Sequence, residues 1–416
     1  MWEKPWKYKE GILAGAGLLA TGMLLQASVG GIDWGRMAFP VNVIVLCLFL
    51  LALTVMNALR RKVYLFAWLS QRSTAVSSLC YVLGVTVLMG LVRQGPSAHP
   101  PGGSGMVAAL SDMLSFWPFV LVYVWMTVVL GMTILRAGLP FRWRRLPSLL
   151  NHIGLFIVIV AGTAGAADMR RLRMTVPLGE TEWRAQDEKT GQMVELPLAI
   201  ELKDFTIDEY PPKLMLIDNS SGRLLPEKTP VHLLLEEGVS GGRLMDWDIS
   251  VTQSLPEAAC IVSADSLNFT GFHSVGSTYA VRIKAANRVS GEQKDGWVSC
   301  GSFLFPYKAL MLDERTSVVM PDREPRRFAS EVIAYTDGGV RKQGTIEVNK
   351  PLDVDGWKIY QLSYDETRGR WSEISVFELV KDSWLLYVYI GMIMMIGGAV
   401  GLFVAARPRT AEEERK

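Results

Sequence analysis

Six long apolar runs divide the chain, and each is long enough to cross a lipid bilayer. A transmembrane helix needs about 20 mostly apolar residues, because the hydrocarbon core of a bilayer is about 30 Å thick. The runs cover approximately residues 11–30, 40–59, 74–92, 114–135, 149–167 and 384–405. The pattern therefore predicts six transmembrane helices, the first of them an uncleaved membrane anchor.

Between the fifth and sixth runs, apolar and polar residues alternate, which is typical of half-buried β-strands. The alternation is clearest at residues 198–207, 278–286, 344–350, 356–364 and 372–380. Turn-forming residues such as Asp355-Gly356 separate several of these stretches. A segment of about 215 residues is long enough to bury a core. We therefore expect a large extracytoplasmic all-β domain, either a sandwich or an open barrel.

These patterns predict four parts of the chain. They are an N-terminal transmembrane hairpin at 1–62, three transmembrane helices at 63–167, the β domain at 168–383, and a final transmembrane helix with a short tail at 384–416. Basic residues gather before the first run, between the second and third, between the fourth and fifth, and after the sixth. Positive charge marks the cytoplasmic side of a membrane protein. Both termini are therefore expected in the cytoplasm, with the β domain on the periplasmic side of a bacterial inner membrane.

One group of basic residues departs mildly from this rule. Arg170, Arg171 and Arg173 follow the fifth run, on the side that the rule assigns to the periplasm. Long translocated domains, however, cross a membrane largely regardless of their charge.

Composition excludes several classes of function. Half of the 416 residues are hydrophobic, the mean hydropathy is +0.22, and the formal net charge is only +2. No basic patch interleaved with aromatic residues is present, so we expect no nucleic-acid partner. The sequence also lacks a phosphate-binding loop, a Cys-x-x-Cys pair and a nucleophile elbow. Whether the chain is an enzyme stays open, and we expect it to be non-catalytic on its own.

The four cysteines are too few for a disulfide framework. Cys47 and Cys80 fall within apolar runs, where a thiol usually packs as a small hydrophobe. Cys260 and Cys300 fall in the β domain and would form one disulfide if that domain faces an oxidising compartment. The sequence leaves this pairing open.

His152 is the candidate site residue. It lies about one turn inside the fifth run, where an ionisable side chain is costly and usually faces protein or a cavity. Neutral imidazole is a common ligand of haem iron. The alternative is a structural histidine that is hydrogen-bonded to an adjacent helix, for example together with Asn151. Both interpretations remain open at this stage.

The surroundings of His152 fit either interpretation. Arg142, Arg144 and Arg145 precede it and would pair with haem propionates through charge-assisted hydrogen bonds. The same arginines also satisfy the positive-inside rule. Three glycines of the fifth run would allow a neighbouring helix or a flat ring to approach closely: Gly154, Gly162 and Gly165. For His232 and His273 we expect ordinary polar or packing roles, and His99 falls in a Pro- and Gly-rich loop where we expect mobility and no fixed ligand.

Two parts of the sequence resemble the ResB family, also called CcsB. The first is the run NHIGLFIVIVAGTAG, which leads directly into the large domain. The second comprises SVVMPDREPRRF, then FASEVIAYTDGG and GTIEVNKPLDVDGWKIYQLSYD, and leads into the last run. The resemblance covers roughly residues 70 to 410, and the closing segment is its most specific part.

The resemblance implies a role in cytochrome c maturation. Members of this family form the System II cytochrome c synthase with a CcsA/ResC-type membrane protein. Together the two proteins carry haem across the membrane and attach it to apocytochrome c. In the family, a histidine in the helix before the outer domain holds haem, and His152 matches it by position. The expected cofactor is haem b with transient axial ligation by His152, and the expected partners are the CcsA/ResC-type protein, apocytochrome c, haem and membrane lipid.

The chain departs from the family pattern in two respects. Three spans normally precede the outer domain, whereas five are expected here, and the outer domain is small. Two other functions compete with the haem-handling role. One is a non-catalytic scaffold that docks a partner through the β domain, and the other is a membrane-anchored sensor, for which the short tail offers no output domain.

Overall fold

The computed structural model describes residues 4–95, 106–139, 141–236, 238–263 and 266–405. The chain divides into two compact units. Residues Met1–Met169 and Asp382–Lys416 form the first unit, and Arg170–Lys381 form the second. His99 and the basic residues of the expected C-terminal tail lie outside the described residues.

Six helices of the first unit are long and apolar enough to cross a membrane, which confirms the expected number within the described residues. Pro118 and Pro147 stand in the first turns of the fourth and fifth of them, where the missing N–H of proline is harmless. The spans are α1 (Tyr8–Val29), α2 (Val41–Leu59), α4 (Arg72–Leu91), α6 (Trp117–Gly138), α7 (Leu146–Asp168) and α8 (Leu385–Ala405). Short elements connect them: η1 (Trp34–Met37), α3 (Tyr64–Leu69), α5 (Met106–Ser111), η3 (Met113–Ser115) and η4 (Trp143–Arg145).

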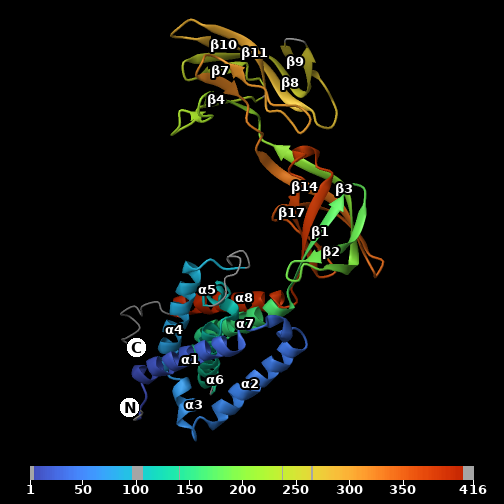
Figure 1. The fold of residues 1–416 in the computed structure, drawn as a ribbon. Coiled ribbons are helices and arrows are strands. Elements are labelled where there is room, and N and C mark those ends of the chain that lie inside the picture. Colours follow the sequence, from blue (N-terminus) through green and yellow to red (C-terminus); the bar gives the residue numbers. More distant parts are fainter. Residues whose placement is uncertain (1–3, 96–105, 140, 237, 264–265, 406–416) are drawn as a thin grey trace, which may run out of the picture. The chain divides into compact units, whose positions relative to one another are not determined.

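The N-terminal hairpin is an integral part of the helix bundle (Figure 1). A Cβ atom on Gly15 of α1 would stand 2.1 Å from Tyr81 of α4, and one on Gly22 would stand 2.5 Å from Pro118 of α6. Glycine at these positions lets the helix backbones approach closely, as is common between membrane helices. Helix α1 therefore packs through its glycines on α4 and α6, two of the helices that precede the second unit.

The second unit begins and ends with an eight-stranded antiparallel sheet in the order β15-β14-β3-β2-β1-β18-β17-β16. The sheet curls so that its two edge strands, β15 and β16, come into contact. A Cβ on Gly344 of β15 would stand 2.6 Å from Leu352 of β16. Phe377, Met174 and Ile200 lie in the core that the sheet encloses. The strands are β1 (Arg170–Pro177), β2 (Thr181–Asp187), β3 (Met193–Glu209), β14 (Pro325–Thr336), β15 (Arg341–Glu347), β16 (Leu352–Val354), β17 (Trp357–Tyr364) and β18 (Ile374–Lys381).

Two further sheets are inserted between β3 and β14 and share a second hydrophobic core. Leu216 from one sheet and Ile249 and Ile283 from the other are fully buried there. One sheet contains β4 (Lys213–Asp218), β5 (Leu224–Leu225), β6 (His232–Leu234), β12 (Leu310–Met311) and β13 (Thr316–Val319). The other contains β7 (Gly241–Leu244), β8 (Trp247–Ser263), β9 (Ser266–Gly271), β10 (Thr278–Asn287) and β11 (Gln293–Ser299).

The expected fold class is therefore confirmed, and the two expected forms of β structure both occur. The first core is enclosed by a curled sheet, as in an open barrel, and the second lies between two sheets, as in a sandwich. We call the first part the barrel lobe and the inserted part, 213–319, the sandwich lobe.

Candidate functional site

His152 lies near the start of α7, six residues after Leu146, and its side chain is half-buried. Its Nδ1 atom lies 2.7 Å from the carbonyl oxygen of Ser148, one turn earlier in the same helix. A carbonyl oxygen can only accept a hydrogen bond, so Nδ1 carries a proton, and in the neutral imidazole Nε2 then has the lone pair. Within the described part of the chain, Nε2 has no hydrogen-bond partner.

The side of α7 that carries His152 faces α6. His152, Phe156 and Thr163 are separated by four and then seven positions, about one and two helical turns, so they share one stripe. The hydroxyl of Tyr123 on α6 lies 3.0 Å from Thr163 Oγ1. Phe156 lies 3.2 Å from the place a Cβ would take on Gly131, also on α6. The imidazole therefore stands at one end of the α6-facing stripe.

A different side of α7 packs on α8 through glycines. A Cβ on Gly154 would stand 2.5 Å from the carbonyl oxygen of Gly391, so no side chain fits between the two helices. A Cβ on Gly165 would stand 2.8 Å from Trp384. Both glycines thus admit a neighbouring helical segment and not a flat ring, whereas Gly162 has nothing within 4 Å.

Asn151, next to His152 in the sequence, makes a hydrogen bond to an adjacent helix. The Asn151 amide donates a hydrogen bond of 3.2 Å to the carbonyl oxygen of Met395 on α8. His152 instead bonds within its own helix. The asparagine therefore ties two helices together, and the neighbouring histidine does not take part in that contact.

The three candidate arginines are exposed, and none has a carboxylate within 4.0 Å among the described residues. Arg145 is the N-cap of α7 and precedes His152 by seven residues. Seven residues are two helical turns, so both side chains leave the same side of the helix, about 10 Å apart along its axis. Arg142 and Arg144 belong to the η4 turn. The structure therefore aligns Arg145 with His152 and places the other two on the connection before the helix.

A polar cluster that the sequence did not indicate closes the other end of α7. The Asp168 carboxylate accepts hydrogen bonds of 2.7 Å from the Phe39 amide, from Asn42 Nδ2 and from Trp384 Nε1. These donors belong to the start of α2 and the segment before α8. We call this cluster the Asp168 clasp, and it joins the N-terminal hairpin to α7 and α8.

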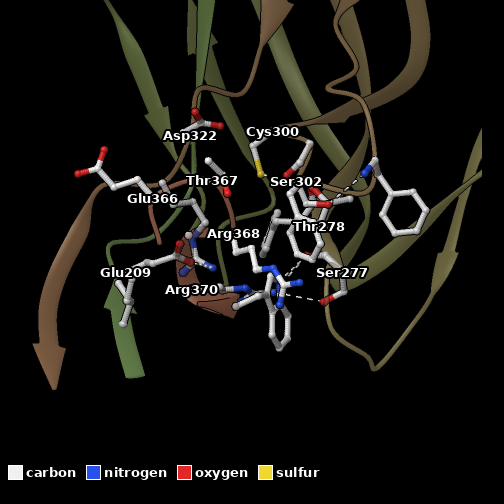
Figure 2. A pocket seen from close by; sticks show the side chains of 18 of the residues that line it. Glu209, Ser277, Thr278, Cys300, Ser302, Asp322, Glu366, Thr367, Arg368 and Arg370 are labelled. Carbon is white, nitrogen blue, oxygen red and sulfur yellow. Dashed lines mark hydrogen bonds and ion pairs between the residues drawn. The ribbon is translucent and has the colours of Figure 1, made fainter. Parts of the chain in front are cut away.

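The second unit contains a cleft of about 520 Å³ where the barrel lobe meets the sandwich lobe (Figure 2). This volume lies within the range of small-ligand sites. The sandwich lobe contributes the start of β10 and the loop after β11, and the barrel lobe contributes the end of β3 and η5 (Gly369–Trp371). The residues that line it include Glu209, Ser277, Tyr279, Phe303, Asp322, Arg323, Tyr364, Glu366, Arg368, Arg370 and Trp371.

Charge in the cleft is partly neutralised. Arg323 forms an ion pair of 2.9 Å with Glu209, and both side chains are largely buried. Arg370 has no carboxylate within 4.0 Å among the described residues; it stacks on Trp371 and donates to Ser277 Oγ at 3.3 Å. Burial, with the nearby Glu366 and Glu209 carboxylates, raises the pKa of Tyr364. The cleft therefore offers one uncompensated guanidinium beside aromatic rings.

Cys260, Cys300 and His273 belong to the second unit. Cys260 and Cys300 are free thiols, and Cys300 lines the cleft within 3.6 Å of Thr278 Oγ1. His273 pairs with Glu257 at 2.7 Å on the exposed surface. The described residues contain no cluster of His, Cys, Asp and Glu that would hold a metal ion.

Much of the cleft is lined by a segment that matches a known protein family. A model of the ResB-like family matches residues 298–372. The match confirms the ResB resemblance in the closing segment of the second unit. The ResB-like segment supplies three stretches of the cleft wall, within 300–307, 322–325 and 364–371. No curated protein matches the chain. The ResB-like match implies involvement in cytochrome c biogenesis, and the six apolar helices make the chain a membrane protein.

Proposed function

We propose that this chain is the haem-handling subunit of a System II cytochrome c synthase. In this role it holds or moves haem across the membrane, together with a CcsA/ResC-type partner, for covalent attachment to apocytochrome c. The observation that carries the proposal is the hydrogen bonding of the His152 ring. Its Nδ1–H donates to the Ser148 carbonyl oxygen at 2.7 Å, which leaves an unshared electron pair on Nε2 inside a membrane helix.

This arrangement suits iron ligation. Metal-bound histidines usually donate their other ring N–H to a carbonyl or carboxylate, which fixes the tautomer and the ring orientation. Arg145 lies two turns away on the same side of α7, and Arg142 and Arg144 lie on the turn before it. All three lack carboxylate partners among the described residues and suit haem propionates. Haem is cargo here, and the described residues supply one axial nitrogen and a basic margin.

We further infer the topology and the role of the second unit. The connections between α2 and α3 and between α6 and α7 are basic, which favours the cytoplasmic side of a bacterial inner membrane for both of them. The barrel and sandwich lobes then lie in the periplasm. Their cleft, built largely from the ResB-like segment, receives a segment of apocytochrome c. The bond-forming chemistry belongs to haem and the substrate thiols, while the protein supplies position and axial ligation.

The test is co-purification of the full chain with its CcsA/ResC-type partner, followed by absorption spectroscopy of the bound haem. We expect His152→Ala to lose most of the haem or to change its axial coordination, and His152→Cys to retain haem with a shifted Soret band. His273→Ala is the matched control, because His273 is exposed and paired with Glu257. Wild-type haem content and an unaltered spectrum in His152→Ala would remove the ligand role.

The cleft favours a second candidate function, a non-catalytic scaffold that docks its partner or apocytochrome through the outer lobes. Arg370 is its best marker, since this guanidinium has no carboxylate partner among the described residues and stacks on Trp371. Under the scaffold function, Arg370→Ala weakens capture of an apocytochrome peptide while His152→Ala leaves haem unchanged. Under the haem-handling function, His152→Ala lowers haem whatever Arg370→Ala does.

A further inference from the structure

The departure of Arg170, Arg171 and Arg173 from the positive-inside pattern has a structural counterpart in the β1–β18 pair. Arg170 of β1 and Lys381 of β18 are direct partners in the antiparallel register. Direct partners project from the same face of a sheet with Cβ atoms about 5 Å apart, and like charges in this position are destabilising. Two cations are therefore held side by side at the base of the barrel lobe.

Neither cation is compensated by an acid. Among the described residues, no carboxylate lies within 4.0 Å of Arg170 or Lys381. On the opposite face of β1, Arg173 has Glu188 at 3.7 Å. Asp382, the acid next to Lys381 in sequence, accepts from the Trp384 amide at 2.9 Å, and Asp168, two positions before Arg170, is the acceptor of the Asp168 clasp. The Arg170–Lys381 pair is thus the uncompensated basic feature of this end of the sheet.

The pair is also partly held in place. The Lys381 ammonium lies 5.4 Å from the ring centroid of Trp357, whose side chain is only 2 % exposed. The cation–π contact directs the lysine across a fixed aromatic surface. Arg170 is exposed and remains free to reach a ligand beside it.

Covalent continuity keeps both cations near the ends of the two helices that connect the second unit to the membrane. Arg170 follows Asp168, the last residue of α7, by two positions, and Lys381 precedes Leu385, the first residue of α8, by four. Consecutive Cα atoms are about 3.8 Å apart, so the Cα atoms of Arg170 and Lys381 lie at most about 8 Å and 15 Å from the ends of these helices, close to the headgroups of a bilayer that α7 and α8 span.

We propose that Arg170 and Lys381 bind the phosphate of an anionic phospholipid headgroup at the point where the barrel lobe joins its two membrane helices. A phosphate diester offers the negative charge and acceptor oxygens that the like-charged pair lacks. Each basic residue near an anionic membrane surface strengthens such binding, and salt screens the attraction. The inference does not rest on the haem-handling function.

The experiment uses the full chain in detergent, titrated with phosphatidylglycerol, with bound lipid counted by native mass spectrometry. We expect the double variant Arg170→Gln/Lys381→Gln to bind the lipid about 30-fold more weakly than the wild type. The double variant Lys228→Gln/Arg326→Gln is the matched control, since it removes the same charge from exposed positions elsewhere in the second unit. It should bind like the wild type.

Three further measurements keep the result interpretable. Arg170→Lys retains the charge and should retain binding, which guards against a folding defect in the double variant. Phosphatidylcholine should bind equally weakly to all variants. Glycerol 3-phosphate and inorganic phosphate should not displace the lipid. Equal lipid affinity in the wild type and the Arg170/Lys381 variant, or displacement by the free phosphates, would overturn the proposal.

Discussion

The two ends of α7 each carry a polar side chain, and the two side chains differ in how fully they are hydrogen-bonded. At one end, the Asp168 carboxylate is satisfied by three donors from α7's neighbours, each at 2.7 Å. At the other end, His152 makes one bond within its own helix and keeps Nε2 without a partner among the described residues. Buried polar groups are normally paired, so the fully satisfied Asp168 carboxylate fits a structural role. An imidazole nitrogen with an unused lone pair at membrane depth is what the proposed ligand role of His152 needs.

The largest expected effect comes from disturbing the packing of α7 on α8, on which both ends of α7 depend. Gly391→Val would push a side chain into the Gly154 carbonyl oxygen and Val158, each 2.8 Å from the Cβ position. We expect a loss of roughly 3 kcal/mol in stability, because neither backbone can move without separating α7 from α8. Thermal unfolding in detergent measures the effect. Gly397→Val is the control, since nothing lies within 4 Å of that Cβ; equal losses in both variants would contradict the glycine contact.

Removal of the Asp168 carboxylate tests the satisfied end. Asp168→Ala leaves the Phe39 amide, Asn42 and Trp384 without their acceptor, so we expect a loss of roughly 2 kcal/mol. Asp168→Asn keeps one acceptor oxygen and should lose less. Unfolding midpoints of both variants, compared with Asp112→Ala at an exposed position, provide the measurement. Equal unfolding midpoints in all three variants would show that the Asp168 clasp does not stabilise the helix bundle.

The same substitution at the other end should do little to stability. His152→Ala removes only a bond to the preceding turn, so we expect less than about 1 kcal/mol of destabilisation together with loss of haem. Unfolding and haem content are measured on one preparation. If destabilisation matches that of Asp168→Ala, His152 is structural and the contrast between the two ends disappears.

The smallest effect concerns the arginines. Arg145 shares a side of α7 with His152, whereas Arg142 lies on the preceding turn. We expect Arg145→Gln to weaken haem retention by a few-fold and Arg142→Gln to weaken it less, because an exposed charge contributes little alone. Haem loss on dilution provides the comparison. A larger effect of Arg142→Gln would place the propionates away from the helix side that carries His152.

The fold class could be predicted because both environments impose simple periodicities. Lipid demands continuous apolar runs, and a half-buried sheet demands alternation, so six membrane helices and a β domain follow from the sequence. The split into a barrel lobe and an inserted sandwich lobe could not be predicted. It depends on the pairing of β3 with β14, which joins Ile207 to Phe328 across the whole insertion.

The site was predictable only where it is local. His152 was recognised because one imidazole in an apolar run is conspicuous, and its role as a haem ligand stays a prediction. The cleft was missed, since Trp371 and Ser277 meet across 94 positions and neither residue is unusual alone. The Asp168 clasp was missed for the same reason, although an acid at the end of a span is a signal that could have been followed.

The insertion of the sandwich lobe has a consequence for the order of assembly. We expect strand β3 to pair with β14 more readily once the chain between them is compact, because closing a long flexible loop costs more entropy than closing a short one. The inserted lobe has its own core and can condense first. The sheet of the barrel lobe then closes as a late step. Substitutions that weaken the core of the sandwich lobe should therefore slow the formation of this sheet, although they lie outside it.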